Sequence, residues 1–166
     1  YYQWLKDNQA AIQAHDEDVM EEMVYGSCLI KKNVVETDPK EQGIRAYLNF
    51  GHTIGHAIEK MSHFSLYHGQ CVAIGMHSGT YLSFKRGHIT KDQYEDILAM
   101  IQGFGLPVSV SGYDAEEILA NTKSDKKMVG GKIKFIVLEE IGQAAIDMTF
   151  SDQELLEGIQ VLFKDE

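Results

Sequence analysis

Proline occurs only at Pro39 and Pro107 in this chain of 166 residues, and the stretches between repeat apolar residues with a helical period. Because proline breaks helix interiors, its scarcity leaves room for long helices. In residues 16–36, for example, Val19 and Met23 begin a series of apolar residues at helical spacing. We therefore predict a mainly α-helical fold.

Capping and breaking residues set the predicted helix boundaries. Asp38-Pro39 ends one helix, since the residue before proline disfavours the helical region, and Thr90 and Ser151 are good N-caps. The predicted helices cover residues 2–13, 16–36, 44–61 (with Asn49-Phe50-Gly51 as a candidate break), 69–86, 91–103, a short segment after Asp114, and 151 to about 163.

One segment departs from the helical pattern. Residues 132–138 and 144–150 alternate β-branched and aromatic residues near period two, with Gly142 between them. This pattern predicts one small β-hairpin near the C-terminus. The expected architecture is a helical, bundle-like domain that carries this hairpin.

Charge and hydropathy exclude several classes of function. The formal net charge is −10, which argues against a nucleic-acid-binding surface. The sequence has no apolar run long enough to span a membrane and no apparent secretion signal.

Cys28 and Cys71 stand in apolar helical stretches outside any CxxC pair, so we expect buried, reduced thiols and a cytoplasmic protein. The first residue, Tyr1, is not a methionine, which suggests a processed product or an excised fragment.

The histidines carry the chemical signal. His52 and His56 are four residues apart, which places both rings on one helix face, and His68 opens the next predicted helix. Two antiparallel helices could bring His68 against His52. Neutral imidazoles suit zinc, cobalt, nickel or iron, although such pairs also arise as ordinary surface or core residues. A zinc-protease motif is excluded, because Thr53 stands where its glutamate would be.

Polar residues extend this pattern on both sides. Arg45, Asn49, His52 and His56 follow one another at spacings of 4, 3 and 4, one stripe of a continuous helix that could bind an anionic, hydroxyl-rich molecule. Farther along, Asp125-Lys126-Lys127 precedes a glycine pair, and by itself this segment reads as an exposed turn.

Three segments closely resemble the signatures of 3-dehydroquinate synthases. The first begins with Lys31-Lys32-Asn33-Val34-Val35 and continues through Gly43 to Glu59, including Asn49-Phe50-Gly51-His52-Thr53-Ile54-Gly55-His56. His68-Gly69-Gln70 opens the second, and Asp125-Lys126-Lys127 with residues 131–138 forms the third. The match runs in register along essentially the whole chain.

The resemblance implies an activity and its cofactors. Enzymes of this family convert 3-deoxy-arabino-heptulosonate 7-phosphate into 3-dehydroquinate and phosphate in the shikimate pathway, with bound NAD and a divalent metal, usually zinc. They tend to form homodimers. By this resemblance the chain is the C-terminal metal- and substrate-binding domain, residues 1–166, without the N-terminal NAD-binding domain, and we expect it to be inactive alone.

The resemblance also implies roles for individual residues. It makes His52 and His68 metal ligands and His56 a polar substrate contact beside the metal. Lys31, Arg45 and Asn49 would contact the carboxylate, hydroxyls and phosphate of the substrate, and one of Lys126 and Lys127 would contact a further anionic group.

Two departures from the family pattern stand out. Gln70 replaces the acid that usually follows the His-Gly pair, and the glutamate that serves as third metal ligand has no match in residues 1–30, where Glu17, Glu21 and Glu22 lack its context. No GxGxxG segment is present. Two alternatives therefore stay open: another sugar-phosphate cyclase of the same superfamily, and a non-catalytic helical metal-binding module.

Overall fold

The computed structural model describes residues 1–63, 65–124, 128–129 and 132–163, which divide into two units, Tyr1–Leu48 and Asn49–Glu166. The fold is mainly helical with a small antiparallel hairpin near the C-terminus, as predicted. None of the helices in these ranges combines the length and the apolar character that a bilayer crossing requires.

The N-terminal unit contains α1 (Tyr2–Asp7), α2 (Gln9–Gln13) and α3 (Glu17–Thr37). The single helix predicted over 2–13 is wrong, because Asn8 separates α1 from α2 and its side chain donates to the Trp4 carbonyl oxygen at 2.9 Å. An asparagine amide that competes for backbone partners commonly interrupts a helix. Asp16 caps the start of α3, since one of its side-chain oxygens accepts from the Val19 amide.

The thiol prediction is half right. Cys71 is buried, whereas Cys28 is exposed on α3, a helix that has no buried residue. An apolar run in the sequence therefore did not mean burial at Cys28.

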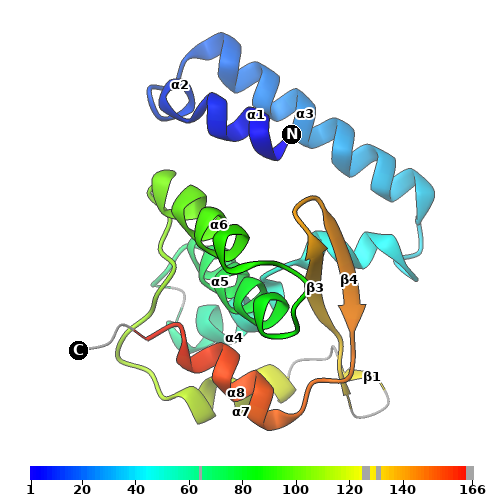
Figure 1. The fold of residues 1–166 in the computed structure, drawn as a ribbon, viewed down its shortest axis with the longest axis vertical. Helices are drawn as coiled ribbons and strands as arrows, with labels where there is room; N and C mark the ends of the chain where they lie inside the picture. Colours follow the sequence, from blue (N-terminus) through cyan, green and yellow to red (C-terminus); the bar gives the residue numbers. More distant parts are fainter. Residues whose placement is uncertain (64, 125–127, 130–131, 164–166) are drawn as a thin grey trace. The chain divides into compact units, whose positions relative to one another are not determined.

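The helices of the second unit form the core of the fold. They are α4 (His52–Met61), α5 (His68–Lys85), α6 (Lys91–Gly103), α7 (Ala115–Ser124) and α8 (Asp152–Gln160). Helix α5 packs against α4, α6, α8 and strand β3, which makes it the central helix of this unit (Figure 1). Ile54, Ile74, Leu82, Ile118 and Ile159 are fully or almost fully buried there.

The predicted helix over 44–61 divides at its candidate break. Residues Ile44–Asn49 form a 3-10 helix, η1, and Gly51 adopts the left-handed conformation (φ +80°) before α4 begins. Glycine enters this conformation without the steric cost that a Cβ atom imposes. The continuous stripe from Arg45 to His56 is therefore wrong, because the two parts do not share one helical period.

The predicted hairpin is shorter in the structure, and a second pair of strands beside it was not predicted. Strands β3 (Phe135–Glu140) and β4 (Gln143–Asp147) form the hairpin, with Gly142 at φ +94° in its turn, while β2 (Lys132–Ile133) pairs separately with β1 (Met128–Val129). The Ser83 hydroxyl accepts from the Leu138 amide at 2.8 Å, which fastens the hairpin to α5.

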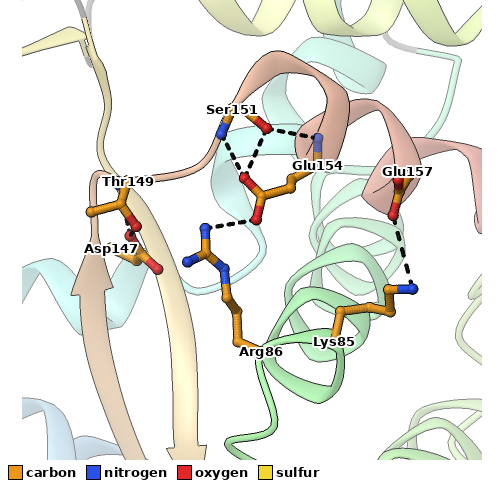
Figure 2. A network of polar contacts seen from close by, with 7 residues as sticks. All are labelled: Lys85, Arg86, Asp147, Thr149, Ser151, Glu154 and Glu157. Atoms are coloured by element: carbon orange, nitrogen blue, oxygen red, sulfur yellow. Dashed lines mark hydrogen bonds and ion pairs between the residues drawn. The ribbon is translucent and has the colours of Figure 1, made fainter.

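Charged side chains join the end of α5 to the start of α8. Arg86 donates to Glu154 at 2.9 Å (Figure 2). The Arg86 guanidinium also lies over the Phe150 ring, 4.3 Å from its centroid. The same Glu154 carboxylate accepts from the backbone and hydroxyl of Ser151, which completes the capping box of α8 and lowers the pKa of Glu154 below its usual value. Thr90 caps α6 in the same way, as predicted.

Candidate metal centre at the contact of two helices

Glycines bring α4 and α5 into close contact. A Cβ atom placed on Gly55 would lie 2.8 Å from the Cys71 carbonyl oxygen, and one placed on Gly75 would overlap the Gly51 carbonyl oxygen. Real Cβ atoms do not approach backbone atoms this closely, so larger residues would force the helices apart. Each helix carries a histidine at its first residue, His52 on α4 and His68 on α5.

Three imidazoles meet at this contact. The ring centroids of His52 and His68 lie 5.3 Å apart, those of His52 and His56 5.3 Å, and those of His56 and His68 5.7 Å. One nitrogen from each ring can be chosen so that all three lie within 4.8 Å of one another. The predicted convergence of His68 with His52 is confirmed, and His56 joins the same cluster.

The cluster suits a divalent metal ion. Imidazole nitrogens are preferred ligands of zinc and of several other first-row metals. The rings of His52 and His56 are half-buried, and His68 is exposed, which gives the cluster one open side. The donor set and its spacing therefore fit an ion that keeps a position for a substrate or water.

Hydrogen bonds orient two of the three rings. Nδ1 of His52 lies 3.2 Å from the Phe50 carbonyl oxygen, and Nδ1 of His68 lies 3.2 Å from each carboxylate oxygen of Glu59. Such partners are typical of metal-binding histidines, because they fix the ring and the position of its proton. Sequence reasoning assigned no role to Glu59, although its spacing of three from His56 continues the stripe of His52 and His56.

Gln70 supports the same end of α5. Its side-chain oxygen accepts from the Tyr67 amide at 2.9 Å, a cap on the first turn of the helix that begins with His68. An amide oxygen accepts this bond as a carboxylate would. The replacement of the usual acid therefore keeps the local geometry around His68.

The predicted anion contacts are distributed over both units. Asn49 ends η1 in the second unit and is half-buried, whereas Lys31 is exposed on α3 and Arg45 is half-buried on η1, both in the N-terminal unit. Lys126 and Lys127 lie outside the described residues. The role of each as a substrate contact stays a prediction.

Local hydrogen bonds fix the segment that carries Arg45. The Asp38 carboxylate accepts from the Gln42 amide at 2.9 Å, the Gly43 amide at 2.7 Å and the Arg45 amide at 3.1 Å. The hydrogen bond from the Gln42 amide lowers the pKa of Asp38 most, and those from the Gly43 and Arg45 amides lower it further. The Arg45 guanidinium donates to the Pro39 carbonyl oxygen at 2.8 Å. Asp38 was predicted only to end a helix, and its anchoring of the following loop was missed.

Comparisons with known proteins agree on one family. Residues 1–128 match the family model described as 3-dehydroquinate synthase C-terminal. A 3-dehydroquinate synthase from Desulforamulus reducens is 37% identical over 94% of this chain and 44% of its own length. The one from Syntrophotalea carbinolica is 39% identical over 88% of this chain and 41% of its own length. The chain thus spans less than half the length of the curated relatives it matches.

Solved structures share the fold. The 2-epi-5-epi-valiolone synthase of Streptomyces hygroscopicus subsp. jinggangensis, solved with NAD+ and Zn2+ bound, superposes with a TM-score of 0.85 and 19% identity over 97% of this chain and 45% of that one. A 2-deoxy-scyllo-inosose synthase complexed with carbaglucose-6-phosphate, NAD+ and Co2+ gives a TM-score of 0.65 and 19% identity over 74% of this chain and 35% of that one.

Proposed function

Because the chain belongs to the family of 3-dehydroquinate synthase C-terminal domains, we propose that it forms the metal- and substrate-binding part of an enzyme making 3-dehydroquinate from 3-deoxy-arabino-heptulosonate 7-phosphate. The observation that carries this proposal is the cluster of His52, His56 and His68 within the region that matches the family. The relatives support a cyclase activity, and both this activity and the particular substrate are our proposal.

The proposed metal ligands are His52 and His68, with His56 beside them. A divalent ion held there would supply Lewis acidity toward a substrate oxygen. His52 and His68 would hold the ion through neutral nitrogens, and His56 would contact a substrate hydroxyl and hold its proton. NAD would supply hydride transfer and would be bound mainly outside the region described here.

The cationic residues would position the substrate. Lys31 and Arg45, with Lys126 or Lys127, would pair with its carboxylate and phosphate, while the Asn49 amide would bind a hydroxyl. Fixed contacts of this kind hold the reacting atoms in one geometry, which lowers the entropic cost of reaction. The hydrogen bonds of Asp38 would keep Arg45 ready for this role.

Zinc titration of the chain by calorimetry tests the metal site. We expect the double variant His52→Ala/His68→Ala to bind zinc at least about tenfold more weakly, since removing ligands leaves too few donors. The control is His88→Ala, which removes an exposed histidine from the same unit. Unchanged binding in the double variant would refute the ligand assignment.

Substrate assays on a protein that joins this region to an NAD-binding domain test the activity. We expect phosphate release from 3-deoxy-arabino-heptulosonate 7-phosphate and none from this chain alone. Turnover only of a sugar phosphate without the carboxylate would favour another cyclase of the superfamily. Zinc binding without turnover of any sugar phosphate in the joined protein would favour a non-catalytic metal-binding module.

A further inference from the structure

Glu59 is an acidic residue in contact with the histidine cluster. It lies on α4, and both its carboxylate oxygens are 3.2 Å from Nδ1 of His68 at the start of α5. The Glu59 side chain is 20% exposed to solvent, whereas the His68 side chain is 53% exposed. A shielded carboxylate interacts more strongly with a ring N–H than one in bulk water does.

The chemistry of the partners decides where each ring carries its proton. An ionised carboxylate only accepts hydrogen bonds, so Nδ1 of a neutral His68 must be protonated, which leaves a lone pair on Nε2. The same argument applies to His52, because the Phe50 carbonyl oxygen facing its Nδ1 also only accepts. Both proposed ligands are therefore prepared to bind an ion through Nε2.

We propose that Glu59 is a positioning residue, which holds His68 in the Nδ1–H tautomer and thereby sets the affinity of the cluster for a divalent metal ion. The part that concerns the ion rests on the proposed function, whereas the part that concerns the tautomer does not. Glu59 acts through His68 and needs no contact with the ion or the substrate.

A purely structural role makes a different prediction. If Glu59 only linked α4 to α5, its replacement would lower the free energy of unfolding, while the His68 proton and the metal affinity of the folded protein would stay the same. The measurements must therefore report on the proton and the affinity separately from stability.

Nitrogen NMR of the chain labelled with ¹⁵N-histidine, free of metal at pH 8, reports the tautomer. We expect the Nδ1–H form of His68 in the unmodified chain and a redistribution of the proton to Nε2 in Glu59→Leu. Glu95→Gln is the matched control, since Glu95 is an exposed carboxylate on α6 that pairs with Lys91 one turn away. An unchanged His68 tautomer in Glu59→Leu would overturn the proposal.

Zinc affinity, measured by competition with a chelator, gives the second readout. We expect Glu59→Leu and Glu59→Gln to weaken binding by about 10- to 100-fold, with the smaller effect for glutamine, whose amide oxygen can still accept from Nδ1. Glu59→Gln keeps the size of the side chain, so it decides the question if Glu59→Leu does not fold. Affinities within twofold of the unmodified chain would overturn the proposal.

The two proposals fail in different ways. Unchanged zinc binding in His52→Ala/His68→Ala would refute the metal site but leave the His68 tautomer as a valid test of Glu59. If zinc binding is weakened in His52→Ala/His68→Ala but unchanged in the Glu59 variants, only the positioning role of Glu59 is refuted.

Discussion

His77 shows how a buried histidine differs from those of the metal centre. Its side chain is 6% exposed, with Nδ1 2.6 Å from the Val108 carbonyl oxygen and Nε2 2.8 Å from the Tyr94 hydroxyl. In the neutral ring the carbonyl accepts from Nδ1–H, so Nε2 accepts from the Tyr94 hydroxyl. Burial lowers the pKa of His77, although its bond to Val108 partly opposes this.

This shift predicts a loss of stability in acid. In the unfolded chain the imidazole takes up a proton near its ordinary pKa of about 6.5, while the buried ring resists protonation, so the unfolded state binds more protons and stability falls below that pH. We expect the free energy of unfolding to drop more between pH 8 and pH 5.5 in the unmodified chain than in His77→Gln. Urea denaturation at both pH values measures this difference.

The control is His88→Gln, which removes an exposed histidine and should leave the pH dependence of the unmodified chain in place. An identical drop in His77→Gln and the unmodified chain would show that His77 does not contribute to acid sensitivity.

At the scale of elements, the α4–α5 contact depends on glycines with no space for a side chain. Gly75→Ala should destabilise the chain by about 1–3 kcal/mol, the usual cost of overpacking, because its Cβ atom would overlap the Gly51 carbonyl oxygen. Gly69→Ala is the control on the same helix, since a Cβ atom there meets no atom within 4 Å. Thermal unfolding followed by circular dichroism compares the two, and equal midpoints would contradict the packing argument.

Features that depend on neighbouring residues were predictable from sequence. The caps Thr90 and Ser151 and the turn at Gly142 are confirmed, because each follows from local backbone chemistry. The break at Asn8 was missed because the hydrogen bond from its side chain to the Trp4 carbonyl oxygen does not change the spacing of apolar residues. The prediction of one polar stripe from Arg45 to His56 was wrong because it assumed a continuous α-helix across Gly51.

The site was partly predictable for a similar reason. The spacing of His52 and His56, with His68 at the next helix start, predicted a cluster that the structure confirms as a geometric arrangement. Glu59 was missed because a charged helix residue usually faces solvent, and only the structure shows its contact with His68. Lys31 and Arg45 came from the family resemblance, and their contact with substrate stays a prediction.

At the scale of the whole molecule, the buried core cluster belongs to the second unit. Its members among the described residues run from Ile54 to Leu162, while Ile12 and Ala46 are the buried apolar residues described in the N-terminal unit. Most folding free energy comes from buried apolar area, so the second unit should contain most of the stability.

We therefore expect residues 49–166, produced alone, to unfold in one cooperative thermal transition and to bind zinc with an affinity near that of the full chain. Circular dichroism and calorimetry measure both properties. The matched sample is residues 1–48, for which we expect no cooperative transition. A gradual melt of residues 49–166 would show that their core depends on the N-terminal unit.

The glycine contact also has a consequence for reading mutational scans. A Cβ atom at Gly51, Gly55 or Gly75 would meet backbone atoms across the contact that brings His52 toward His68. A side chain at any of these positions would therefore displace the rings without altering a single donor atom. A scan scored only by growth or turnover would rank these glycines with the histidines. Selection for packing and selection for chemistry would be indistinguishable at these positions, and separating them requires a score for abundance of the folded protein alongside the score for activity.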